Sequence, residues 1–99
     1  MFIAMSRFEV ANGLEDEVSR AFKNRPHKVD SVPGFIRMEV LRPQDEPAQF
    51  WLLTWWTDEA SWDSWYHSHH YKDSHKGMPE GLKLVPDKTR IWKMERVAE

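Results

Sequence analysis

The sequence predicts a small α+β domain with the element order β-α-β-β-α-β. Three observations lead to this prediction. The chain has 99 residues, which is the size of one domain. Four segments have the apolar alternation or continuous apolar run of strands, and two segments between them carry apolar residues at helical spacing. We therefore expect residues 1–99 to form a single domain.

The first strand is expected at residues 2–10, where Ser6 is a small polar residue on an otherwise apolar face. An amphipathic helix of about four turns is expected over residues 14–29. Acidic residues fill its first turn, where the helix dipole favours negative charge. Pro26 lies inside this pattern and is expected to kink the helix or to end it early.

The second and third strands are expected at residues 35–41 and 50–56, joined by a polar hairpin loop. The third strand is apolar on both faces, with Trp51, Leu53 and Trp55 on one of them. A strand of this kind is usually covered on both sides. The chain has helices for one side only, so a second copy of the chain is expected to cover the other.

Thr57 or Asp58 is expected to cap a second helix that carries Trp65. Ser68 is a possible start for a short further helix, residues 78–87 are expected to be a loop, and residues 89–97 a last strand. This order is the ferredoxin-like arrangement. It predicts an antiparallel sheet with both helices on one face and the other face bare.

Composition excludes several classes of function. The net charge is −2 without a long basic run, so no nucleic acid is expected as partner. The chain has no cysteine, which excludes disulfides and thiolate metal sites. No signal segment or membrane-length apolar stretch is present, and a cytoplasmic location is expected. Six Trp, five Phe and two Tyr indicate aromatic surface toward a cavity, ligand or partner, with an aromatic-rich core as the alternative.

Four of the five histidines lie between positions 67 and 75. His67, His69 and His70 are interpreted as a solvated helix junction, and a metal held by the cluster is a minor alternative. His75 follows the aromatic helix and could act as a base, a proton carrier or an axial ligand to haem iron. The alternative for His75 is a purely structural role.

Four further side chains are candidates for the space between helices and sheet. Periodicity alone favours core packing for Trp65 and Phe22. The Ser6 hydroxyl needs a hydrogen-bond partner, which could be backbone or a ligand. Arg25 could meet an anion such as a propionate or be simply exposed. No nucleophile triad, phosphate loop or pair of carboxylates stands out.

Several features together resemble the antibiotic-biosynthesis-monooxygenase-like family of dimeric ferredoxin-like α+β barrels. They are the strand order, the segment RPHKVDSVPGF at residues 25–35, the LRP strand end at 41–43, and the run LTWW at 53–56 before an aromatic helix. The resemblance covers essentially the whole chain. Within the family, the chain is most similar to the bacterial haem-degrading monooxygenases. Trp65 and His75 have the ten-residue spacing of their Trp over the haem and their iron-binding His, but Ser6 stands in place of their Asn.

This resemblance implies that haem is both substrate and cofactor, and that His75 is the axial ligand of the iron. Trp65 is expected to press on the macrocycle, Phe22 and Arg25 to contact the haem, and Ser6 to position water or bound oxygen. Dioxygen would be the co-substrate, with electrons from a reductase or small reductant and no tightly bound flavin. Ring opening would release iron from a homodimer in which each subunit has its own pocket.

Two alternatives remain open on the sequence. One is a cofactor-independent monooxygenase of the same family that acts on a small aromatic or quinol-like substrate. The other is a dimer that binds a small ligand without chemistry, for which the replacement of the family Asn by Ser6 is the main support.

Overall fold

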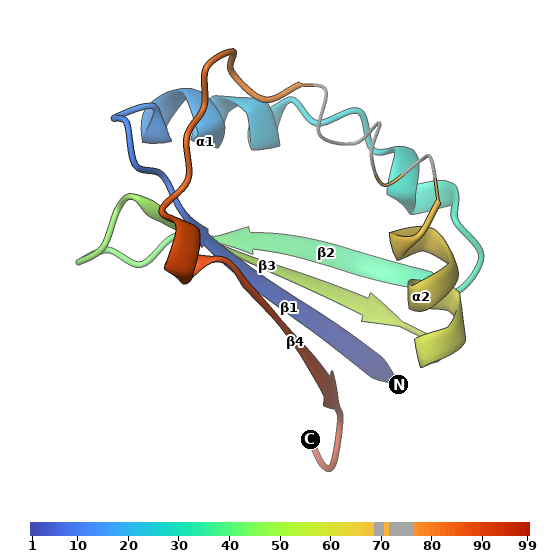
Figure 1. Ribbon diagram of the computed structural model, residues 1–99. Helices are drawn as coiled ribbons and strands as arrows, with labels where there is room; N and C mark the ends of the chain where they lie inside the picture. The colour runs from blue at the N-terminus through green and yellow to red at the C-terminus, as the bar shows by residue number, and fades with distance from the viewer. Residues whose placement is uncertain (69–70, 72–76) are drawn as a thin grey trace.

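The computed structural model describes residues 1–68, 71 and 77–99. It contains one four-stranded antiparallel sheet, with α1 and α2 on the same face (Figure 1). The strand order is β2-β3-β1-β4. This confirms the predicted ferredoxin-like α+β fold. The elements are β1 (Phe2–Glu9), α1 (Glu15–Lys23), η1 (Lys28–Ser31), β2 (Phe35–Leu41), β3 (Gln49–Trp56), α2 (Glu59–Tyr66), η2 (Pro86–Lys88) and β4 (Arg90–Glu95).

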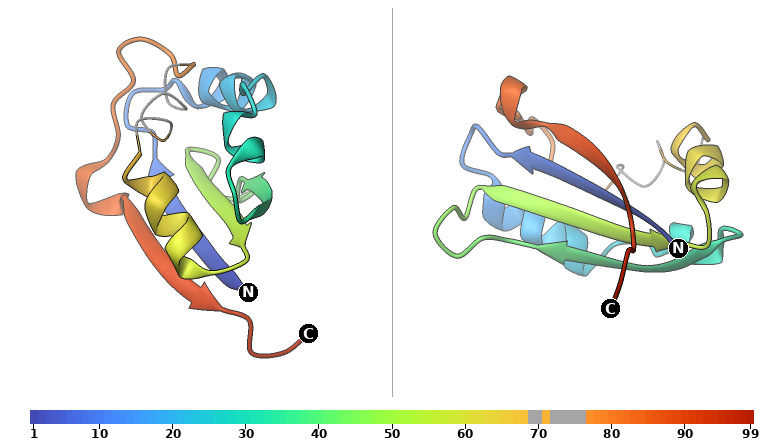
Figure 2. Two further views of the ribbon diagram at one scale, coloured as in Figure 1. Left: turned by 90° about the vertical axis from the view of Figure 1, so that its right-hand side faces the viewer. Right: turned by 90° about the horizontal axis from the view of Figure 1, so that it is seen from below.

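The two helices cover different ends of the sheet face (Figure 2), and each covers a separate part of the core. The cluster beneath α2 is built on Trp56 and Trp62, and the cluster beneath α1 on Val18 and Phe50. Partly buried side chains, including Met38 and Val40 of β2, complete the two clusters. No helix among residues 1–68, 71 and 77–99 is long and apolar enough to cross a membrane.

The first helix is shorter than the sequence pattern predicts. It has nine residues and ends at Lys23, with Asn24 as its C-cap. The prediction of about four turns is therefore wrong, and of the two effects expected from Pro26 the early end is the one observed. Proline lacks the N–H that a further helical turn needs and disfavours helical backbone at the preceding residue. His27 then takes a left-handed conformation (φ 56°), and η1 follows as a separate turn.

The second helix begins where the sequence places it. Asp58 is its N-cap, and its carboxylate accepts a hydrogen bond from the Ser61 backbone N–H at 2.8 Å. That hydrogen bond lowers the pKa of Asp58 below its usual value. Beyond α2, the backbone N–H of Tyr71 donates to Ser68 Oγ at 3.4 Å, in keeping with Ser68 as a helix start. The rest of the predicted short helix lies outside the described residues.

The pairing of β2 with β3 shifts register near its start, and the sequence pattern does not predict this shift. Phe35 pairs with Trp56, but the next paired residue is Arg37, opposite Trp55. Ile36 is thus the extra residue of a β-bulge. Because of it, Phe35 faces α2 and Arg37 faces the opposite side of the sheet, although strict alternation would put them together.

The sheet face without helices is not left as bare apolar surface. Arginine side chains lie over its tryptophan rings, with the Arg37 guanidinium 4.0 Å from the Trp55 ring centre. Trp55 is only 8% exposed in the single chain. Trp55 is therefore already mostly buried in the single chain, where Arg37 lies over its ring, and the covering of this face by a second copy stays a prediction. Arg7 similarly lies 5.7 and 5.2 Å from the ring centres of Trp51 and Trp92.

Candidate functional site

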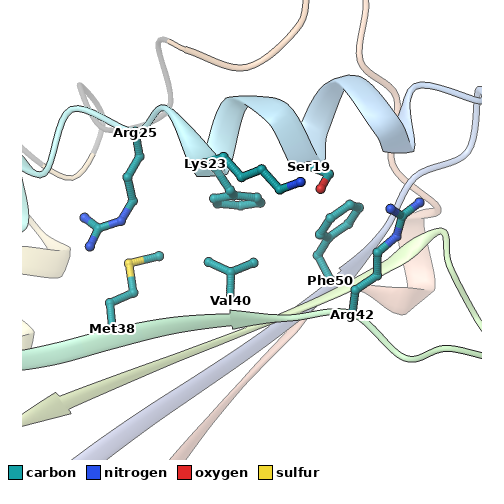
Figure 3. A pocket seen from close by; sticks show the side chains of 8 residues that line it. Ser19, Lys23, Arg25, Met38, Val40, Arg42 and Phe50 are labelled. Atoms are coloured by element: carbon teal, nitrogen blue, oxygen red, sulfur yellow. The ribbon is translucent and has the colours of Figure 1, made fainter.

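A cavity of about 260 Å³ opens between α1 and the strands β2 and β3 (Figure 3). Aliphatic and aromatic side chains line it toward the sheet, and three cationic side chains are distributed around it (Figure 3). Such a combination suits a ligand with an apolar body and acidic groups. The lining residues are Ser19, Phe22, Lys23, Arg25, Met38, Val40, Arg42 and Phe50.

The amphipathic pattern of α1 brings Phe22 to the cavity. Its ring lies 5.8 Å from that of Phe50 on β3 and 6.2 Å from that of Phe8 on β1. Phe8 and Phe50 are themselves stacked at 5.4 Å. These three rings pack together, and two of them, Phe22 and Phe50, line the cavity. Phe22 is therefore both a core residue and a cavity residue, so core packing and contact with a ligand are compatible interpretations of it.

Arg25 follows α1 and also lines the cavity. Its guanidinium forms an ion pair with Asp30 of η1 at 3.2 Å, and His27 Nδ1 lies 3.0 Å from the other carboxylate oxygen. Partial burial raises the pKa of Asp30, but the hydrogen bonds from His27 and Arg25 outweigh this effect and hold the pKa below its usual value. Asp30 therefore stays charged and orients Arg25.

Arg42 closes the other end of the cavity. It donates to the Pro47 carbonyl at 2.5 Å, pairs with Asp16 of α1 at 3.2 Å, and lies 5.3 Å from the Phe50 ring centre. Lys23, the third cation, makes no ion pair or hydrogen bond with a side chain in the described part of the protein. It is thus the one cation of this cavity that the described residues leave unneutralised.

Trp65 projects from α2 into the other part of the core. Its ring lies 5.5 Å from that of Trp56 and 4.9 Å, edge-on, from that of Tyr71. Its indole N–H is buried and has no hydrogen-bond acceptor among the described residues. Buried polar groups are nearly always hydrogen bonded. This N–H is therefore an unsatisfied donor to which a ligand could supply the acceptor.

Ser6 lies on the helix-covered face of β1, paired with Leu52 of β3 and Ile91 of β4. Its hydroxyl makes no hydrogen bond within the described part of the chain, so the backbone partner considered from the sequence is not found there. Ser6 and Trp65 share the side of the sheet on which the cavity opens but do not line it. Met38 lies between the cavity and the core cluster beneath α2, because it lines the cavity and packs against the same cluster as Trp65.

Most of the histidine cluster lies outside the described residues. His69, His70 and His75 lie outside the described residues, so the assignment of His75 as a haem-iron ligand stays a prediction. His67 is described, and its Nδ1 lies 2.9 Å from the Asp63 carbonyl oxygen. Within residues 1–68, 71 and 77–99, no group of three His, Asp or Glu side chains is placed to hold a metal ion.

Sequence reasoning identifies Phe22 and Arg25 but misses most of the cavity. Met38 and Val40 of β2 line it from the helix side of the sheet, and the pattern of Lys23 is that of an ordinary lysine in the last turn of a helix. Arg42 had a usable signal, since it belongs to the LRP strand end that carries the family resemblance.

The sheet topology and the two helices on one face define an α+β protein of the ferredoxin-like class, with a cavity between sheet and helices. A family model described as antibiotic biosynthesis monooxygenase matches residues 1–77. The chain therefore belongs to the antibiotic biosynthesis monooxygenase family.

A mycobilin-producing heme oxygenase from Mycobacterium tuberculosis is 27% identical over 63 residues, which are 64% of this chain. The match spans 60% of that relative's length. Among solved structures, the heme-degrader MhuD of M. tuberculosis with two hemes in its active site has a TM-score of 0.80 at 21% identity, covering 100% of this chain and 98% of MhuD.

A further similar structure belongs to an oxygenase of another kind. SnoaB, a cofactor-independent oxygenase from Streptomyces nogalater, has a TM-score of 0.77 at 17% identity, covering 99% of this chain and 94% of SnoaB. These likenesses confirm the fold. They also show that the same fold serves both haem-degrading and cofactor-independent oxygenases.

Proposed function

We propose that this protein binds haem and opens its ring with dioxygen and a reductant, releasing iron. The observation that carries the proposal is the cavity, which combines an aromatic wall at Phe22 and Phe50 with cationic groups. The partial match to a mycobacterial heme oxygenase supports it. The sequence adds the ten-residue spacing of Trp65 and His75.

The residues present suit a porphyrin in their chemistry. Flat apolar walls are of the kind that packs against a macrocycle, and Arg25, which lines the cavity, would meet a propionate. The unpartnered Trp65 indole N–H offers a further donor on the same side of the sheet. The cavity is smaller than the ~300–1,000 Å³ usual for ligand sites, so a porphyrin bound there has to extend beyond its open side.

In this proposal each candidate residue has one task. His75 holds the iron, and Trp65 presses on the macrocycle, a deformation that changes haem reactivity. Phe22 packs against the ring, while Arg25, oriented by Asp30, holds a propionate. Ser6, whose hydroxyl has no partner in the described residues, positions water or the co-substrate. The bound haem supplies the iron centre at which dioxygen is activated.

Haem titration followed by absorption spectroscopy tests the binding step. Wild-type protein is expected to give a Soret band that saturates at one defined stoichiometry. His75→Ala should weaken binding at least about tenfold, because an axial ligand is lost. His67→Ala serves as the control, since the His67 imidazole is exposed and contacts the backbone carbonyl of Asp63 in α2. Unchanged binding by His75→Ala would contradict the ligand assignment.

The enzymatic step needs a separate experiment. With ascorbate and air, and with no flavin added, the Soret band of the loaded wild type should decay and free ferrous iron should appear in a chelator assay. A band that persists under these conditions, with haem fully bound, counts against haem degradation and leaves a ligand-binding role.

A cofactor-independent oxygenase is the second candidate, and one observation favours it. A cavity of about 260 Å³ suits a small aromatic substrate better than a whole porphyrin. Oxygen uptake in haem-free protein with a polycyclic phenol or quinol would select this function. The same measurement without substrate gives the baseline.

We also propose that the helix-free sheet face pairs with a second copy. Met5 and Leu53 lie opposite each other at its centre, beside an apolar depression of about 310 Å³. The arginines that cover tryptophan rings lie at positions around this centre.

Leu53→Glu should convert the dimer to a monomer at micromolar concentration in sedimentation velocity, because it places charges at the centre of an apolar contact. Ile91→Glu is the control variant. Ile91 lies on the edge strand β4, on the helix-covered face of the sheet, and is 36% exposed, so this substitution should leave the dimer intact. A monomeric wild type would contradict the pairing.

A further inference from the structure

The charges around the cavity are unevenly balanced. Arg25 is neutralised by Asp30, and Arg42 by Asp16. Lys23 has no acidic partner among the described residues, although it lines the same cavity. The described residues of the cavity lining therefore leave one positive charge unbalanced beside apolar walls. An unpaired cation next to an apolar binding surface favours a ligand that brings its own negative charge.

The placement of Lys23 separates it from Arg25. Figure 3 shows its side chain lying along α1, with the ammonium group directed toward Ser19 and away from Arg25. The next residue, Asn24, uses its side-chain amide to donate to the Arg20 carbonyl at the helix end. The helix end thus has its own polar partner, and Lys23 remains available to a ligand.

We infer that Lys23 binds a carboxylate of the ligand and makes the site selective for planar apolar acids over their neutral esters. This inference rests on the proposed haem-binding function and adds to it a specificity-determining residue. Arg25, held by Asp30, supplies orientation at one end of the cavity. Lys23 adds a positive charge that no described acidic side chain balances, and this charge strengthens the preference for an acid over an ester.

A simpler role for Lys23 exists and gives a different result. A lysine in the last turn of a helix interacts favourably with the helix dipole, and its loss would then lower stability without changing ligand choice. The experiment must therefore compare two ligands on the same variants. Iron protoporphyrin IX and its dimethyl ester have the same macrocycle and differ in their carboxylate charges.

Both porphyrins are titrated into wild type, Lys23→Met, Lys23→Arg and Lys28→Met in the same detergent-containing buffer at low salt. Lys28 is an exposed lysine of η1 that does not line the cavity, so its variant controls for general loss of positive charge. Lys23→Met should bind the diacid about twofold to fivefold more weakly, the range of a solvent-exposed ion pair. It should bind the ester as wild type does.

Lys23→Arg should retain the wild-type preference, and Lys28→Met should behave as wild type with both ligands. The difference between diacid and ester should shrink at about 1 M salt, where the screening length falls to ~3 Å. Equal diacid affinities of Lys23→Met and wild type would overturn this inference while leaving haem binding intact. A wild type that binds neither porphyrin would overturn the proposed function and this inference together.

Discussion

Replacing Trp56 with alanine is expected to lower the free energy of unfolding by about 3–5 kcal/mol. Trp56 is completely buried and lies between the sheet and α2. Its ring is 5.4 Å from that of Phe35, edge-on, and 5.5 Å from that of Trp65. Alanine would leave a cavity that these rings cannot fill without moving, and urea unfolding followed by circular dichroism measures the loss.

The hydrogen bonds of Trp56 add to this cost. Its indole N–H donates to Thr54 Oγ1 at 2.9 Å, and that hydroxyl donates to the Ala4 carbonyl at 3.4 Å. Removing the indole deprives the buried threonine oxygen of its donor, which carries a desolvation penalty.

Trp51→Ala is the matched control, because this tryptophan is partly exposed on the helix-free face. It should cost less than half as much. Trp51 lies on the proposed dimer face, so both variants are compared with wild type at two protein concentrations. Only the loss caused by Trp51→Ala, taken relative to wild type at the same concentration, should change with concentration. Equal losses for the two variants would show that α2 does not hold Trp56 as the structure indicates.

The order of elements was predictable because alternation and helical spacing are local properties of the sequence. The alternation in β1 and β3 correctly separates Ser6 from Arg7 and Trp56 from Trp55. The bulge at Ile36 was not predictable, because Phe35 and Ile36 are both apolar and either could begin the alternation that faces the helices. The length of α1 was open for a similar reason: the apolar spacing continues past Pro26 into η1, where Val29 is buried.

The candidate site was predictable only in part, because a cavity depends on which side chains leave space. Phe22 and Arg25 were identified from the helix pattern, and both line the cavity. Lys23 was not, since a single exposed lysine acquires meaning only when its neighbours are seen to be paired. His75 lies outside the described residues and stays a prediction.

Gly34→Ala is expected to lower the free energy of unfolding by about 2–4 kcal/mol, from positive-φ strain and overpacking together. Gly34 has φ 86°, a conformation that residues with a Cβ rarely adopt. An added Cβ would also fall on the side chain of Ser61 in α2. Thermal and urea unfolding measure the loss.

Gly13→Ala separates the two causes. Gly13 has φ 77° and open space around its missing side chain, so this variant carries the backbone strain alone, about 1 kcal/mol. A Gly34→Ala loss no larger than that of Gly13→Ala would contradict the close contact with α2.

The position of Gly34 also connects stability to the site. Its carbonyl accepts a hydrogen bond from Thr57 N–H at 2.8 Å, just before α2 begins. Because Ser61 cannot retreat without moving α2, Gly34→Ala should shift the helix that carries Trp65. Tryptophan fluorescence and haem affinity should therefore change in Gly34→Ala and stay as in wild type in Gly13→Ala, even under conditions where both proteins remain folded.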